Sequence, residues 1–466
     1  MANPPREACG VVGVFTPGEA AARTAFFGLF SLQHRGQESA GIAAADGTSI
    51  SCRTEMGLVS QAFHEFDLSR LPGHISVGHT RYSTTGSTHL DNAQPLEVEG
   101  LHGRIALAHN GNVINALPLR VEMEGGWGCR FTTSTDSEVI AQMLVNTSGK
   151  DWGDRIAYCM RRLQGAYSVT FLTNNTLIAM RDPLGVRPLC VGMYNGGWVV
   201  ASESCALDHI GATLLRELEP GEAIQIDEEG LQTIHNGNEG KRALCSFEYI
   251  YFARPDSILD ERSVHAARRE MGRQLAMQAP VEADMVMGIP DSATPAAVGY
   301  AEAAGIPYQE GLIKNRYVGR TFIQPDQRLR DLGVRLKFNP LPEVLAGKRV
   351  IVVDDSIVRG TTTPHVVSLL RSAGAKEVHL RVCAPPIISP CHFGVDMASK
   401  GELIAAENTV PEIQEYVGAD SLEFLSVEGL FWAINKEADR CCAACFTNQY
   451  PIDVQLELGK MALERS

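Results

Sequence analysis

Hydrophobic residues in the second half of the chain form short continuous runs separated by helical patterns. The runs at residues 285–289 and 350–353 are apolar almost throughout, which is typical of strands buried on both faces of a sheet. Residues 263–278 are rich in Ala, Arg, Glu, Met and Leu and predict a helix. Strands that alternate with helices predict a parallel sheet covered by helices. The first half instead is rich in glycine and in β-type runs such as residues 167–172.

The pattern changes near residue 235, which predicts a boundary between domains. A chain of 466 residues is too long for one simple core, so two or three domains are expected. Residues 226–242 are polar and glycine-rich, and we interpret them as the inter-domain connection. The predicted domains are residues 9–235 and 245–466, preceded by residues 1–8.

Composition and charge argue against several classes of protein. The net charge of -14 argues against a nucleic-acid binder, because phosphate backbones require clustered Lys and Arg. No apolar run approaches the length of a membrane span, and residues 1–8 have no apolar core of a secretory signal. We therefore expect a cytoplasmic protein. In that reducing compartment the twelve cysteines are not expected to form disulfides. Six of them are predicted to be small buried side chains: Cys52, Cys129, Cys159, Cys190, Cys205 and Cys383.

The sharpest motif is VIVVDDSIVRGTT at residues 350–362. Its apolar run predicts a central strand, and Asp354 and Asp355 follow at the carboxyl end, where open α/β sheets bind ligands. The Gly-Thr-Thr turn leads into a predicted helix, whose N–H groups and dipole suit a phosphate. The two carboxylates can accept hydrogen bonds from ribose hydroxyls or hold Mg²⁺. An apolar run followed by two aspartates is, by itself, equally compatible with a strand that ends in solvated acids.

The complete motif resembles that of the type I phosphoribosyltransferases, which bind phosphoribosyl pyrophosphate (PRPP). The resemblance implies one Mg²⁺ per subunit, held by Ser292, Asp354 and Asp355. Residues 314–322 are basic around a central glycine. Alone they favour a solvated loop, but beside the phosphate motif we interpret them as a lid that excludes water. The PRPP-binding residues predicted in this way are Asp354, Asp355, Ser356, Arg359, Gly360, Thr361, Thr362, Lys314 and Arg320.

Four further motifs accompany Cys9 in the first half: LQHRGQESAGI at residues 32–42, GHTRYST at 78–84, AHNGN at 108–112 and TDSE at 135–138. Together they resemble the class II glutamine amidotransferases, which are N-terminal-nucleophile hydrolases. Their chemistry requires a thiolate that attacks the glutamine amide and forms an acyl-enzyme. In this hydrolase type the base is the nucleophile's own α-amino group, whose pKa is ~7.7–8.0. An internal Cys9 has an amide there instead, so we predict that residues 1–8 are a propeptide removed to expose Cys9.

The same resemblance assigns roles to four other residues. Asn110 and the N–H group of Gly111 would form the oxyanion hole. Arg81 would pair with the α-carboxylate of glutamine, and Asp136 with its α-ammonium group. Taken singly, Asn110-Gly111 is also compatible with a hairpin turn, and Arg81 and Asp136 with a surface ion pair.

Four late cysteines stand in distinctive contexts. Cys442 and Cys445 form a CxxC, while Cys245 and Cys391 lie in CSFEYIYFAR and SPCHFG. Four thiolates suit either a [4Fe–4S] cluster or zinc, and their spacing does not separate the two. These contexts resemble the amidophosphoribosyltransferases of the bacillus type, which implies one [4Fe–4S] cluster per subunit. CxxC spacing favours Cys442 over its neighbour Cys441.

The combined resemblance covers nearly the whole chain and implies a fold and a reaction. The expected fold is an α+β αββα hydrolase domain, then an α/β phosphoribosyltransferase domain with a parallel sheet and a C-terminal helical, cluster-binding extension. The expected reaction converts glutamine, PRPP and water to 5-phosphoribosylamine, glutamate and pyrophosphate, the first step of de novo purine synthesis. The family also implies a homotetramer and feedback inhibition by purine nucleotides.

Two other functions remain open at this point. Another class II amidotransferase would make a glucosamine phosphate or an amide, but it would need an isomerase domain or an ATP site. A regulator that binds PRPP without catalysis would not need a cysteine nucleophile with a glutamine pocket.

Overall fold

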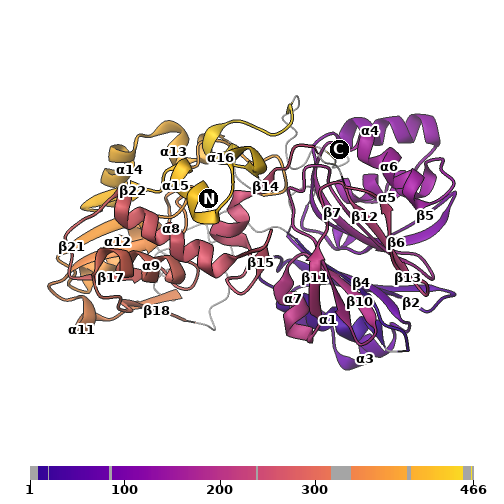
Figure 1. Cartoon of the computed structure of the whole chain (residues 1–466), viewed down its shortest axis with the longest axis horizontal. Coiled ribbons are helices and arrows are strands. Elements are labelled where there is room, and N and C mark those ends of the chain that lie inside the picture. Colours follow the sequence, from indigo (N-terminus) through magenta and orange to yellow (C-terminus); the bar gives the residue numbers. More distant parts are fainter. Residues whose placement is uncertain are drawn as a thin grey trace.

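The computed structural model describes residues 9–18, 20–82, 87–237, 240–315, 337–395, 400–454 and 463. They form two lobes that follow one another along the chain (Figure 1), with the first half at the right of the view and the second at the left. No helix in these ranges is long and apolar enough to cross a membrane.

Two antiparallel sheets stack face to face in the first lobe. The order of the seven-stranded sheet is β11-β9-β10-β1-β4-β2-β3, and that of the six-stranded sheet is β13-β12-β8-β7-β6-β5. The first sheet comprises β1 Gly10–Phe15, β2 Ser39–Ala45, β3 Ile50–Met56, β4 Ile75–Arg81, β9 Cys190–Tyr194, β10 Gly197–Ala201 and β11 Thr213–Glu217. The second comprises β5 Leu96–Gly100, β6 Gly103–Val113, β7 Gly165–Leu172, β8 Leu177–Arg181, β12 Ala223–Asp227 and β13 Gly230–His235.

Three apolar layers hold this lobe together. The middle layer lies between the sheets and joins residues such as Val11 and Val77 of the first to Ala106 and Ala108 of the second. One outer layer packs helices α1 Ala21–Ser31 and α7 Ser204–Ile210 on the first sheet. The other packs α4 Ala116–Glu122, α5 Asp136–Asn146 and α6 Trp152–Arg162 on the second. This is the predicted αββα sandwich.

A four-stranded parallel sheet of order β17-β20-β21-β22 forms the second lobe. Its strands are β17 Met285–Gly288, β20 Arg349–Asp354, β21 Glu377–Val382 and β22 Ser421–Phe424. The main helices are α8 Val264–Gln278, α9 Thr294–Ala304, α12 Thr363–Ser372, α14 Val410–Val417 and α15 Val427–Ile434. The predicted strands at 285–289 and 350–353 and the predicted helix at 263–278 are confirmed, and Ser263 caps α8 with its hydroxyl.

Small elements join the lobes and cover the sheet. They are β14 Leu244–Cys245 with β23 Cys441–Cys442, β15 Ile258–Leu259 with β16 Arg262–Ser263, β18 Leu312–Lys314 with β19 Phe338–Pro340, the π-helix η3 Glu248–Phe252, and α16 Ala444–Thr447.

Two expectations are wrong in part. Residues 226–235 do not belong to the connection, because β12 and β13 form an antiparallel hairpin at the edge of the second sheet. An edge hairpin exposes polar side chains, so its sequence looks like a linker. Cys52 and Cys129 are half-buried, whereas Cys159, Cys190, Cys205 and Cys383 are buried as predicted.

Candidate active sites

Cys9 lies at the start of β1, next to the carboxyl end of β4. The antiparallel register pairs Gly10 with Thr80 and so brings Cys9 beside Arg81. The Cys9 thiol donates to the carbonyl oxygen of Tyr82 at 3.2 Å, and the Tyr82 N–H group donates back to Sγ at 3.3 Å. Burial raises the pKa of the thiol to about 12, with Arg81 lowering it and Glu38 and Asp136 raising it. The thiol is therefore protonated near neutral pH and needs a base before it can act as a nucleophile.

Arg81 ends β4 and is almost completely buried. Its Nη1 donates to the carbonyl oxygen of Ser87 at 3.1 Å and lies 3.8 Å from a carboxylate oxygen of Glu38. The interpretation of Arg81 and Asp136 as a surface ion pair is wrong, because both side chains are buried. Glu38 was not singled out from the sequence, although it stands in the motif at residues 32–42.

Asn110 and Gly111 lie inside β6, not in a hairpin turn. Asn110 is completely buried, and neither atom of its amide has a hydrogen-bond partner in the described part of the chain. Such an amide is rare in a folded protein and points to a group that binds there. Alternation along β6 and β1 turns the side chains of Asn110 and Cys9 into the space between the sheets, because Ala108 and Val11 line that space.

Gly111 has a backbone conformation that only glycine adopts readily. Its φ is +150°, and a Cβ atom there would stand 1.9 Å from the carbonyl oxygen of Ala166 on the neighbouring strand. A side chain at this position would therefore force β6 and β7 apart.

Asp136 is the first residue of α5, where the helix dipole favours a negative charge. Its Oδ2 accepts a hydrogen bond from the N–H group of Val113 at 2.8 Å and lies 3.9 Å from Nδ1 of His109. Asp136 is thereby held against β6, within electrostatic range of Cys9. The structure thus gathers the five residues predicted for the glutamine site: Cys9, Arg81, Asn110, Gly111 and Asp136.

A second site lies at the carboxyl ends of β17 and β20. These strands are neighbours in parallel register, with Gly288 opposite Val353, so the loops that follow them lie side by side. The hydroxyl of Ser292, in the loop after β17, donates to Asp355 Oδ2 at 2.5 Å. Ser356 donates to the other oxygen of Asp355 at 2.7 Å. The predicted grouping of Ser292, Asp354 and Asp355 is therefore present.

Burial and mutual repulsion shape the charge of this pair. Burial, then the charge of Asp355, raises the pKa of Asp354 well above its usual range. Burial also raises the pKa of Asp355, against the hydroxyls of Ser292 and Ser356 and the charges of Arg268 and Lys337. The half-buried Asp354 and the buried Asp355, at a loop-lined sheet edge, form a donor set of hard oxygens that suits Mg²⁺.

The structure describes most of the other residues predicted to bind PRPP. Lys314 on β18 pairs with Asp291 at 2.5 Å, beside Ser292. Arg359 pairs with Glu402 at 3.0 Å, and this contact was not expected. Gly360, Thr361 and Thr362 lead directly into α12. Arg320, most of the predicted lid and the predicted propeptide lie outside the described residues.

Three segments bring four cysteines together where the lobes meet. Parallel pairing of β14 with β23 sets Cys245 beside Cys442, on the same face, while Cys441 alternates to the other face. The N–H groups of Ile388 and Ser389 donate to the carbonyl oxygen of Cys445 and so bring in the segment of Cys391. Burial and the neighbouring thiols of Cys245, Cys442 and Cys391 raise the pKa of Cys445 well above its usual range.

The spacing of these four thiols decides whether they suit a single metal ion or a cluster. Within the described ranges, no three His, Cys, Asp or Glu side chains converge closely enough to hold a single metal ion. An iron–sulfur cluster makes a different demand, because each of its four thiolates binds a different iron atom and they enclose a larger volume. Four mutually neighbouring thiols fit that demand.

The folds and sites define a glutamine amidotransferase domain joined to a phosphoribosyltransferase domain. Family models agree: residues 79–209 match a glutamine amidotransferase domain, and residues 255–387 match a phosphoribosyl transferase domain.

Comparison with whole proteins identifies the family. The chain is 51% identical to an amidophosphoribosyltransferase of Synechocystis over 99% of its own length and 95% of that protein. It is 52% identical to the amidophosphoribosyltransferase of Archaeoglobus fulgidus, covering 96% of the chain and 98% of that protein. The solved structure of glutamine PRPP amidotransferase from B. subtilis, complexed with ADP and GMP, superposes with a TM-score of 0.91 at 46% identity, over 98% of this chain and 100% of that one. The chain belongs to the amidophosphoribosyltransferase family and is an enzyme with that activity.

Proposed function

We propose that the chain converts glutamine, PRPP and water to 5-phosphoribosylamine, glutamate and pyrophosphate, the first step of de novo purine synthesis. The observation that carries the proposal is the pairing of two sites of complementary chemistry in one chain. A buried thiol beside an unpartnered amide suits hydrolysis of an amide, and an aspartate pair at a sheet edge suits a phosphorylated sugar.

Glutamine hydrolysis begins with the Cys9 thiol. Removal of residues 1–8 would give Cys9 a free α-amino group, which takes the thiol proton as the sulfur attacks the side-chain amide. The Asn110 amide and the Gly111 N–H group would stabilise the oxyanion of the tetrahedral intermediate. The α-amino group would then protonate the leaving ammonia, and water would release glutamate from the acyl-enzyme.

Recognition of glutamine would rest on two opposite charges. The guanidinium group of Arg81 would bind the α-carboxylate, and the carboxylate of Asp136 would bind the α-ammonium group. Both are buried and held by backbone contacts, so they select free glutamine over a glutamine within a peptide.

The second site would bind PRPP by its hydroxyls and phosphates. Asp354 and Asp355 would accept hydrogen bonds from the ribose, and the turn before α12 would bind the 5-phosphate. The binding residues we assign are Asp354, Asp355, Ser356, Arg359, Gly360, Thr361, Thr362, Lys314 and Arg320. Mg²⁺ held near Ser292 and the aspartate pair would neutralise charge on the departing pyrophosphate.

The four cysteines Cys245, Cys391, Cys442 and Cys445 would hold one [4Fe–4S] cluster. The reaction needs no redox step, so the cluster would serve structure or oxygen sensing. Reduced thiols at these positions and at Cys9 suit a cytoplasmic location.

Three further features complete the proposal. Ammonia would travel from Cys9 to the sugar through a closed apolar passage, because ammonium is not a nucleophile. Purine nucleotides would inhibit the enzyme, as the ADP and GMP in the B. subtilis relative suggest. The enzyme would be a homotetramer.

Substitution of the nucleophile tests the proposal. Cys9→Ser should abolish synthesis from glutamine while leaving synthesis from added ammonia, and Cys129→Ser, a half-buried thiol elsewhere, should leave both. Loss of both reactions in Cys9→Ser would contradict separate sites. The intact mass of fully active enzyme should lack residues 1–8; their retention would refute the α-amino base.

A further inference from the structure

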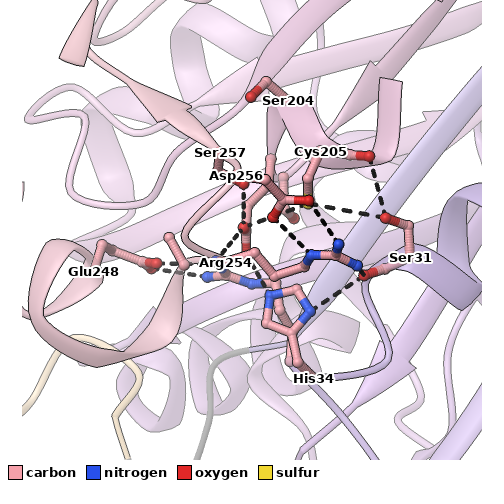
Figure 2. A network of polar contacts seen from close by, with 12 residues as sticks. Ser31, His34, Ser204, Cys205, Glu248, Arg254, Asp256 and Ser257 are labelled. Atoms are coloured by element: carbon pink, nitrogen blue, oxygen red, sulfur yellow. Dashed lines mark hydrogen bonds and ion pairs between the residues drawn. The ribbon is translucent and has the colours of Figure 1, made fainter. Parts of the chain in front are cut away.

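A buried carboxylate from the second lobe binds two arginines of the first. Glu248 begins the π-helix η3 and is completely buried. It accepts from Arg35 Nη2 at 2.8 Å and Nη1 at 3.1 Å, and from Arg187 Nη1 at 3.0 Å. In Figure 2, Glu248 projects from its helix at the left of the view, and dashed lines join its carboxylate to guanidinium nitrogens. Ser31 and His34 lie farther to the right. Glutamine hydrolysis as proposed does not use any of these groups.

Arg35 connects Glu248 to the nucleophile. Its Nε donates to the backbone carbonyl oxygen of Cys9 at 3.1 Å, and its Nη1 donates to Glu203 at 2.5 Å. The guanidinium group therefore has its direction fixed by two buried carboxylates and holds the backbone of the reactive residue.

Arg187 connects Glu248 to the strand of the oxyanion hole. Its Nε and Nη2 donate to the carbonyl oxygen of Phe393 at 3.1 and 2.8 Å. The next residue, Gly394, lies against Gly111 so closely that a Cβ on Gly394 would stand 2.7 Å from the Gly111 carbonyl carbon. On the other side, the carbonyl oxygen of His392 accepts from the Asn112 side chain at 2.9 Å.

We propose that Glu248 is a positioning residue for glutamine hydrolysis. One carboxylate of the second lobe orients both the arginine on the Cys9 backbone and the arginine on the segment behind Gly111. It therefore sets the separation of the thiol from the oxyanion donors. The inference rests on the proposed glutamine chemistry at Cys9. A buried ion-pair network adds little net stability by itself, and in some proteins such buried charges specify a single geometry.

Glu248→Gln tests this role because it keeps the side-chain shape and removes the charge. We expect kcat for glutamine hydrolysis to fall about 10- to 100-fold, as small misplacements of reacting groups do. KM for glutamine should change less than about threefold, because Arg81 and Asp136 are untouched. Synthesis from ammonia should stay near wild type. Glu302→Gln is the matched control, since Glu302 also pairs with two arginines, Arg269 and Arg273, but at the exposed surface of the second lobe.

Gly394→Ala tests the contact of the Arg187-bound segment with Gly111 separately. It should also lower kcat for glutamine hydrolysis while changing KM for glutamine little. An unchanged kcat in Glu248→Gln would overturn the inference. The inference would also be overturned if both variants lost glutamine-dependent and ammonia-dependent synthesis equally, because that result would show that the residues serve only the folding of the enzyme. Failure of the wild-type enzyme to use glutamine would instead overturn the proposed function.

Discussion

The N–H group of Val113, on strand β6, donates a 2.8 Å hydrogen bond to the carboxylate of Asp136, the first residue of helix α5. This bond holds the Asp136 side chain near Asn110 and Gly111, and it requires an acceptor oxygen but not a negative charge. An amide oxygen at position 136 can accept the same bond, so the charge can be removed while the geometry stays.

Asp136→Asn should therefore raise KM for glutamine by about 10- to 100-fold, the cost of losing one charged partner of the α-ammonium group. Synthesis from ammonia should be unchanged, and steady-state kinetics with each nitrogen source measure both. Asp151→Asn is the control, since Asp151 caps the start of α6, a helix that packs on the outer face of the second sheet. A variant with normal KM and low kcat would show that Asp136 acts on chemistry and not on recognition.

Asp354→Asn should reduce synthesis from either nitrogen source by at least about 100-fold, since the PRPP site serves both. Because burial and Asp355 raise the pKa of Asp354, removal of its charge should also raise the melting temperature in the absence of Mg²⁺. The hydrogen bond from the Asp355 N–H group to Asp354, 2.9 Å long, can persist with an amide. Thermal melting with and without Mg²⁺ and PRPP checks this, and a less stable variant that retains ammonia-dependent synthesis would contradict it.

The four-cysteine site predicts that the iron content depends on Cys391 and not on Cys441. Cys391→Ser should lose most iron and sulfide, whereas Cys441→Ser, also a half-buried thiol, should keep about four of each per chain. Anaerobic purification followed by an iron and sulfide count and an absorption spectrum measures this. Equal iron content in the two variants would rule out the assigned ligand set.

Acid stability should depend on Glu203, which is completely buried and accepts a hydrogen bond from Arg35. Burial alone would raise its pKa, but His34 and Arg35 lower it far below the ordinary 4.5. A carboxyl with a lowered pKa stabilises the fold above its unfolded value, and this stabilisation is lost as the pH falls below about 4.5. Glu203→Gln should cost about 3 kcal/mol at pH 7 and flatten the decline in stability from pH 5 to 3. Denaturant unfolding across this range gives the comparison, and parallel curves for the two proteins would disprove the role.

The sequence predicts local features well and long-range partners poorly. The strands at 285–289 and 350–353 could be predicted from their apolar runs. Because they are adjacent and parallel in the sheet, Ser292 contacts Asp355 across a sequence separation of 63 residues. The edge hairpin at 223–235 was mistaken in part for a linker, because an exposed edge strand and a loop share a polar composition.

The contacts of Arg35 could not be predicted in the same way. It lies in the motif at residues 32–42, yet its partner Glu248 is 213 positions away and in the other lobe. A buried charge needs a partner, but nothing in the local pattern shows which carboxylate supplies it. Glu38 and the Arg359–Glu402 pair were missed for the same reason.

Nitrogen tracing tests the central claim most directly. The enzyme is given PRPP and glutamine labelled with ¹⁵N at the side-chain amide, in the presence of excess unlabelled ammonium at a pH where little of it is free ammonia. If ammonia released at Cys9 is passed directly to the sugar beside Asp354 and Asp355, the phosphoribosylamine should carry ¹⁵N almost completely. A product labelled only to the level of the mixed ammonium pool would contradict a direct transfer between the two sites.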